Sequence, residues 1–133
     1  MTIIESDIVT ISAERSKVKA YILNPHHLQN LLPEGKFSDW KSDNSSCSFK
    51  IQNAYTIGLE LASAPEDEHV VYRSSAGSPF SFTLTAQLAE VNGSTEAKLV
   101  CSAEMNSFLE MIVKTPLRNL FNHMVSRMTT VSL

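Results

Sequence analysis

The side chains of this sequence that could do chemistry are few and widely scattered. Glu5 and Asp7 are two residues apart, so on an extended strand they share a face and could act as paired carboxylates. Their place near the start of a strand instead favours an exposed edge in water. Cys101 could act as a nucleophile only with a base such as His123 beside it. We therefore expect no catalytic residue, and an enzymatic role is the weakest of the functions considered.

Metal and nucleotide chemistry have even less support. His26 and His27 are adjacent, so on a helix their side chains diverge by about 100° and cannot share one ion. His69 stands alone in a charged turn, and Asp39 beside Trp40 has the character of a surface carboxylate. No pair of cysteines or histidines has the spacing of a zinc site, and no glycine-rich loop could hold a phosphate. We expect no metal and no cofactor.

The remaining polar candidates lie inside apolar patterns, and these patterns predict the strands and helices that carry them. Between Phe80 and Leu88 every second residue is apolar, and the pattern resumes from Ala97 to Met105 after a turn at Asn92-Gly93-Ser94. This period of two predicts a hairpin of two long strands with one apolar face. Over 107–128 the apolar spacing changes to three and four residues, which predicts a long amphipathic helix.

That helix carries its own start signal and one irregularity. Ser107 and Glu110 have the spacing of a capping box, and Glu110 can also pair with Lys114 one turn later. Pro116 removes one backbone hydrogen bond and crowds the carbonyl of Ile112, so we expect a kink there.

The first half of the chain predicts shorter elements. Residues 3–11 have the pattern of one strand, and Ser12 could cap a helix over 13–23 with an apolar stripe of Val18, Tyr21 and Ile22. Asn24-Pro25 ends that helix, and 26–32 could form further helical turns. Alternating segments at 37–42, 47–51, 55–61 and 69–76 predict four more strands.

Bulk composition limits the class of protein. A chain of 133 residues with 43% hydrophobic and 19% charged residues predicts a single folded domain over 1–133. The net charge of −3 argues against a nucleic-acid groove. Without a membrane-length apolar run or a signal peptide, and with Cys47 and Cys101 on expected strands, the sequence predicts a cytoplasmic protein with reduced thiols.

The order of strand, two short helices, six-strand meander and long C-terminal helix resembles the START-like superfamily, also called SRPBCC, which includes polyketide-cyclase-like proteins. The sequence segments that carry the resemblance are Val9-Thr-Ile-Ser-Ala-Glu, Asn24-Pro-His-His-Leu, Leu32-Pro-Glu, Phe37-Ser-Asp-Trp, Asn106-Ser-Phe-Leu-Glu-Met and Lys114-Thr-Pro-Leu. It spans nearly the whole chain and is similar to small, uncharacterised bacterial members. The resemblance implies an α+β helix-grip fold, in which a curved antiparallel sheet of six to seven strands wraps around the last helix and often encloses an apolar cavity. It implies no catalytic residue.

The inner face of such a sheet, together with the facing stripe of the helix, predicts the lining of a ligand cavity. The predicted lining residues are Tyr21, Phe49, Tyr55, Ile57, Tyr72, Ser74, Phe80, Phe82, Leu84, Leu99, Cys101, Leu109, Ile112, Val113 and Leu117. The same face includes Ile51, Leu59, Met105, Leu120, Phe121 and Met124. The three tyrosines and Ser74 are the expected polar anchors of an otherwise apolar site. The alternative is that these side chains simply fill one another, as protein interiors do.

Three functions follow from this pattern. The leading hypothesis is binding of a small apolar or amphipathic molecule without catalysis. The second is a protein-interaction module of the chaperone-activator type, with a filled core and an exposed apolar patch around Leu28, Leu31 and Trp40. The third is a cyclase-like or hydrolase-like enzyme. The basic residues Lys114, Arg118 and Arg127 are too few for stable membrane association, and the chain is expected to be a monomer or a homodimer through a free edge strand.

Overall fold

Two long strands joined by a tight turn form the centre of the fold. The computed structural model describes every residue except 52–54, 65, 76 and 132, and for Tyr55 it describes the backbone but not the side chain. Strands β7 (Ser81–Val91) and β8 (Ser94–Glu104) pair in antiparallel register along their whole length. Asn92 and Gly93 both have positive φ, 52° and 82°, as a type I′ hairpin turn requires. The predicted hairpin is therefore confirmed.

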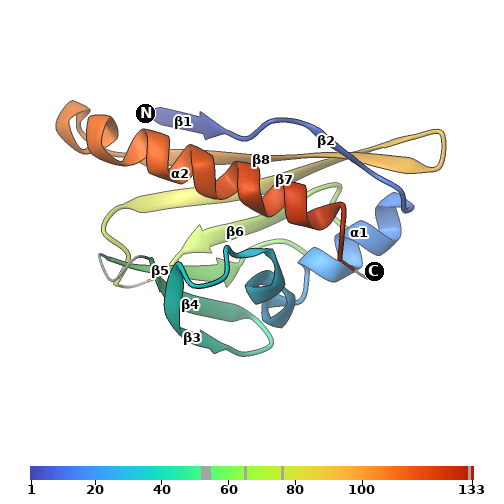
Figure 1. The fold of residues 1–133 in the computed structure, drawn as a ribbon, viewed down its shortest axis with the longest axis horizontal. Helices are drawn as coiled ribbons and strands as arrows, with labels where there is room; N and C mark the ends of the chain where they lie inside the picture. The colour runs from blue at the N-terminus through green and yellow to red at the C-terminus, as the bar shows by residue number, and fades with distance from the viewer. Residues whose placement is uncertain (52–54, 65, 76, 132) are drawn as a thin grey trace.

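The sheet grows from this hairpin in both directions. Beyond β7 lie β6 (Val70–Ser74), β5 (Tyr55–Leu61), β4 (Ser46–Ile51) and β3 (Phe37–Ser42), each antiparallel to the next. On the other side β8 pairs with β1 (Thr2–Glu5) and β2 (Val9–Ile11). The result is an eight-stranded antiparallel sheet crossed on one face by a long helix (Figure 1), so the α+β helix-grip class is confirmed.

The single strand expected over 3–11 is wrong, because the chain leaves the sheet between β1 and β2. The Ser6 amide still donates to the carbonyl of Leu99, but the Leu99 amide donates to Ser6 Oγ, both at 2.9 Å. The Asp7 amide then donates to Asn122 Oδ1 at 2.7 Å. The Ser6 side chain thus takes over a backbone bond that a continuous strand would make, and the sheet gains one strand over the predicted number.

The two short helices sit at one end of the sheet. Helix α1 (Arg15–Ile22) is shorter than the expected 13–23, and the predicted Ser12 cap is wrong because the N-cap residue is Glu14. Glu14 offers no side-chain cap, and the Arg15 amide instead donates to Glu90 Oε1 of β7 at 3.0 Å. The expected apolar stripe of α1 is buried, and the 3₁₀ helix η1 (Pro25–Leu31) follows.

Helix α2 (Ser107–Met128) has the predicted length but a different cap. Asn106 is the N-cap residue, and its Oδ1 accepts from the Leu109 amide at 2.8 Å, so the capping box at Ser107 is wrong by one residue. Glu110 and Lys114 approach to 3.8 Å as expected. The helix continues past Pro116, which lies inside it and is exposed to solvent.

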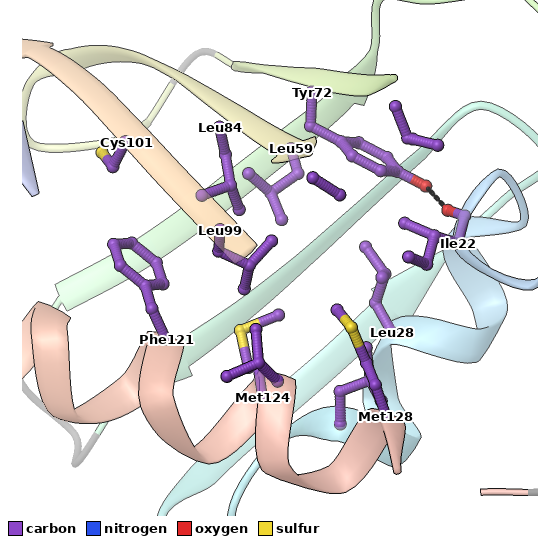
Figure 2. Packing of buried hydrophobic residues seen from close by; sticks show 14 of the residues in the cluster. Ile22, Leu28, Leu59, Tyr72, Leu84, Leu99, Cys101, Phe121, Met124 and Met128 are labelled. Atoms are coloured by element: carbon purple, nitrogen blue, oxygen red, sulfur yellow. Dashed lines mark hydrogen bonds between the residues drawn. The ribbon is translucent and has the colours of Figure 1, made fainter. Parts of the chain in front are cut away.

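The core lies between α2 and the sheet, and it extends under the short helices. Helix α2 buries Val113, Leu117, Phe121, Met124, Val125 and Met128. Figure 2 shows Phe121 and Met124 pointing toward Leu84, Leu99 and Cys101 of the central strands. At the edge of this cluster Tyr72 of β6 donates from its hydroxyl to the carbonyl of Ile22 at 2.6 Å, which ties the sheet to the end of α1 (Figure 2).

This hydrogen bond predicts unequal costs for removing two tyrosine hydroxyls. Tyr72→Phe leaves the buried Ile22 carbonyl without its donor, and we expect a loss of about 1–3 kcal/mol in the free energy of unfolding. Tyr21→Phe is the matched control, because the Tyr21 hydroxyl bonds to the exposed Asn30, which water can satisfy, and we expect about 0.5–1 kcal/mol. Urea unfolding followed by circular dichroism measures both, and equal losses would contradict this account.

Candidate functional site

A small apolar cavity lies between the sheet and α2. Its volume is about 20 Å³, which is close to the ~10–15 Å³ that a single water needs. The lining residues are Phe49, Ile57, Leu59, Phe80, Phe82, Leu84, Cys101, Leu117, Leu120, Phe121 and Met124. Among the described residues the interior is thus nearly filled by side chains, and this cavity is too small for an organic molecule.

Seven of the predicted lining residues surround this cavity. They are Phe49, Ile57, Phe80, Phe82, Leu84, Cys101 and Leu117. The other four lining residues belong to the same predicted inner face, so strand alternation and helical spacing were enough to find them. The structure places these residues together, while ligand binding by them stays a prediction.

The expected polar anchors do not line the cavity. The Tyr72 hydroxyl donates to the Ile22 carbonyl, and the Tyr21 hydroxyl accepts from Asn30 Nδ2 at 3.1 Å. Ser74 Oγ accepts from the Phe82 amide at 3.0 Å. The side chain of Tyr55 lies outside the described residues. The three described residues do not line the cavity, because each hydroxyl takes part in a hydrogen bond within the fold, and their role in ligand binding stays a prediction.

The remaining predicted residues also do not line the cavity. Leu99 is buried beside it, and Leu109 is half-buried near the start of α2. Ile112 is 53% exposed, because it lies on the flank of α2 rather than on its sheet-facing stripe. Ile112 and the buried Val113 instead line a groove that runs beside the first half of the helix.

This groove is much larger than the cavity, with a volume of about 680 Å³. It lies between α2, the end of β4 and the segment that joins η1 to β3. The lining residues are Pro33, Glu34, Lys36, Ile51, Ile112, Val113, Thr115, Pro116, Leu117, Asn119, Leu120 and His123. Leu117 and Leu120 line both hollows, so these two side chains separate the groove from the cavity. Sequence periodicity could not find the groove, because the 33–36 segment has no repeating pattern.

Burial makes the two thiols poor nucleophiles. Desolvation raises the pKa of Cys101 to about 11. Desolvation, with a smaller contribution from the negative charge of Asp43, raises the pKa of Cys47 to about 12. Both thiols are free and protonated near neutral pH. Cys101 lines the cavity and His123 lines the groove, so the base that Cys101 would need is on the other side of Leu117 and Leu120.

The paired-carboxylate hypothesis is also wrong. Glu5 is in β1 and forms an ion pair with Lys98 at 2.9 Å. Asp7 follows the strand, where the chain has left the sheet, so the two carboxylates do not share a strand face. Neither of them lines the cavity or the groove.

One polar pair escaped the sequence reasoning. Ser42 Oγ lies 2.7 Å from His26 Nδ1 and accepts from Trp40 Nε1 at 3.2 Å. A serine beside a histidine is the start of a nucleophile–base arrangement, but no carboxylate among the described residues bonds to the His26 ring. The pair ties η1 to β3, which is a structural role.

The two adjacent histidines have different neighbours in the structure. His27 stacks on Tyr21 with ring centroids 4.2 Å apart, so His26 and His27 diverge as predicted. Among the residues the structure describes, no three His, Cys, Asp or Glu side chains group as metal ligands.

The prediction of an exposed apolar patch around Leu28, Leu31 and Trp40 is wrong, because both leucines are buried and Trp40 stacks on Phe49. No described helix is both long and apolar enough to cross a membrane.

Comparison with known proteins supports the fold alone. No family model matches the sequence, and no curated protein matches it. Among solved structures, XoxI from Bacillus cereus is 12% identical over 97% of this chain and 94% of that protein, with a TM-score of 0.76. A protein from Chromobacterium violaceum is 16% identical over 96% of this chain and 94% of its own, with a TM-score of 0.71. A protein in the dynemicin biosynthetic locus is 14% identical and has a TM-score of 0.65, covering 96% of this chain but 45% of the other.

The raised pKa values predict that both thiols are inert in the folded protein. Ellman's reagent at pH 8 should modify neither cysteine until guanidinium unfolds the chain, since the thiolate is the reactive form. Fast modification of either thiol in the folded protein would contradict the burial described here.

The same pKa values predict a pH dependence of stability. In the unfolded chain a thiol ionises near ~8.5, whereas in the folded protein it stays protonated to about 11 or about 12. The contribution of each thiol is complete below the unfolded pKa, and above it is lost at about 1.4 kcal/mol per pH unit. Urea unfolding between about pH 8.5 and 10 should show this decline. The Cys101→Ala variant should show a shallower decline, and equal slopes would contradict the prediction.

Proposed function

We propose that this protein binds a small amphipathic molecule in the groove beside α2 and does not transform it. The observation that carries the proposal is the position of Leu117 and Leu120, which line both the groove and the apolar cavity behind it. The groove is therefore the entrance to the inner face of the sheet. A bound molecule would lie in the groove with its apolar end against these two leucines.

The composition of the groove suits such a molecule. One side is aliphatic, with Ile51, Ile112 and Val113, and the polar lining residues are Glu34, Lys36, Thr115, Asn119 and His123. Ligand sites are largely apolar hollows of about 300–1,000 Å³ with a few polar groups, and the groove lies in this range. The polar end of the ligand would face Lys36 and Asn119 at the rim.

The internal cavity limits how deep the molecule reaches. A volume of about 20 Å³ cannot take an alkyl chain, so the apolar end enters only when Leu120 moves aside. Leu120 is half-buried and lies at the boundary, which makes it the side chain that can move with least loss of packing. The methionine at position 124 can then adapt, because its side chain is unbranched.

The described lining of the cavity favours binding over catalysis, because it includes no acid–base pair. Cys101 is the lining residue of the cavity with a titratable group, and its thiol stays protonated near neutral pH. The similarity to a protein in the dynemicin biosynthetic locus supports the SRPBCC, polyketide-cyclase-like resemblance of the sequence. Two buried free thiols also fit a reducing compartment such as the cytoplasm.

The first experiment is native mass spectrometry of the protein purified from cells, with a denatured sample beside it. The expected result is an added mass that disappears on denaturation. An anionic naphthalene dye, 1-anilinonaphthalene-8-sulfonate, then serves as the amphipathic probe, and its fluorescence should saturate at one dye per protein. Dodecanoate should displace the dye, because both place an anion at the rim.

A variant pair locates the binding. Leu120→Trp fills the passage between groove and cavity, and we expect the dissociation constant of the dye to rise about tenfold, which is about 1.4 kcal/mol. Val91→Trp is the control, since Val91 is an exposed aliphatic residue at the far hairpin. Equal binding by both variants would exclude the groove. No dye binding and no carried mass, with a protein partner that survives salt washes, would instead support the interaction module.

A further inference from the structure

Pro116 leaves one backbone acceptor of α2 without its usual donor. In an α-helix each amide donates to the carbonyl four residues earlier, so the Ile112 carbonyl would accept from residue 116. Proline has no N–H, and α2 nevertheless continues through this position to Met128. The side-chain hydrogen bonds of α2 in the described part of the chain involve its two ends and Asn122, and none of them reaches this carbonyl. The Ile112 oxygen can therefore accept a hydrogen bond from outside the helix.

This carbonyl lies on the groove side of α2. It points along the helix from Ile112 toward Pro116, and both residues line the groove. Both residues are also exposed. Carbonyls on the solvent side of a helix tilt outward, and the proline ring pushes this one away from the helix axis. A molecule bound in the groove can therefore reach the oxygen.

Two polar side chains follow this carbonyl along the same wall of the groove. Thr115 and Asn119 lie three and seven residues after Ile112, so the three residues share one stripe of α2. Both side chains are exposed, and neither is among the α2 side chains that form hydrogen bonds within the described part of the chain. This wall of the groove thus combines aliphatic side chains with hydrogen-bonding groups that a ligand can use.

We propose, as an extension that rests on the proposed function, that the groove selects an amphipathic molecule with a hydroxyl group partway along its apolar chain. The ligand hydroxyl donates to the Ile112 carbonyl. A hydroxyl suits this place better than an ammonium group, because the neighbouring Ile51 and Val113 would desolvate a charge. The helix rises about 10 Å between Ile112 and Asn119. A polar head group at Asn119 therefore places the hydroxyl within the chain and not beside the head group.

Calorimetric titration of the protein with matched fatty acids tests this selectivity. Dodecanoate is compared with monohydroxylated dodecanoates that differ from one another only in the position of the hydroxyl. The ligand hydroxyl exchanges a hydrogen bond to water for one to the carbonyl, so at least one isomer should bind about two- to tenfold more tightly than dodecanoate. The carbonyl carbon resonance of Ile112 should shift on addition of that isomer and stay unchanged with dodecanoate, a readout that needs no variant.

A variant pair identifies the acceptor. Pro116→Ala supplies the missing amide, which occupies the Ile112 carbonyl from within the helix. This variant should bind dodecanoate and the preferred isomer equally, and the amide that it introduces should exchange slowly with solvent. Thr115→Val is the matched control, because it changes the neighbouring side chain of the groove and leaves the carbonyl open. The preference for the hydroxylated isomer should persist in it, and circular dichroism verifies that both variants are folded.

The outcomes separate this inference from the proposed function. Dodecanoate binding without a preferred isomer, or a preference that survives in Pro116→Ala, would overturn the inference and leave the proposed function intact. A preference that disappears in Thr115→Val would assign the contact to the threonine hydroxyl and would also overturn the inference. If neither dodecanoate nor any hydroxylated isomer binds, the proposed function and the inference both fail.

Discussion

The contact between α2 and the concave face of the sheet is the interaction on which the rest of the structure depends. The inner face of the central strands is apolar from Phe82 to Leu88 and from Ala97 to Ala103, and it would be exposed to water without the helix. The helix in turn needs the sheet, because most of its buried stripe faces the sheet, while its C-terminal end packs on η1. Each fully buried aliphatic or aromatic side chain contributes about 1.5–3 kcal/mol, so the several buried residues of α2 dominate its stability. Everything else in the fold either extends this face or closes its ends.

The periodicity of apolar residues is enough to predict this interaction, because the contacting side chains recur at a regular spacing in each element. The period of two in β7 and β8 and the period near 3.6 in α2 place Leu84, Cys101 and Phe121 on facing surfaces without any knowledge of the fold. The strand order follows, since sequential strands with short turns pair with their neighbours. For the same reason the lining of the small cavity could be found in the sequence. Ile112 shows the limit, because a helix flank and a helix face differ by only one residue position.

Several of the other failures share one physical cause, which is competition between side chains and the backbone for hydrogen bonds. Ser6 accepts from the Leu99 amide and so allows the chain to leave the sheet, which no apolar pattern reveals. Asn106 caps α2 in place of Ser107, because either residue can accept from a free amide and only the local geometry decides. Tyr72 and Ser74 were expected to meet a ligand, but each hydroxyl satisfies or accepts from a backbone group instead. Polar residues in an apolar pattern thus identify a site only after the needs of the backbone have been met.

Core packing also explains why the proposed binding site is the surface groove and not the interior. The interior is packed by the same large side chains that make the sheet and helix adhere, and the cavity of about 20 Å³ is what remains. Enlarging it for a ligand would remove contacts that hold α2 in place, and cavities of that kind are costly at about 24 cal/mol per Å³. A ligand in the groove would need no new cavity, because the groove is already open and Ile112 in its lining is exposed. Under the proposed function, a ligand that covered Ile112 would release its unfavourable hydration and would stabilise the fold instead of opposing it.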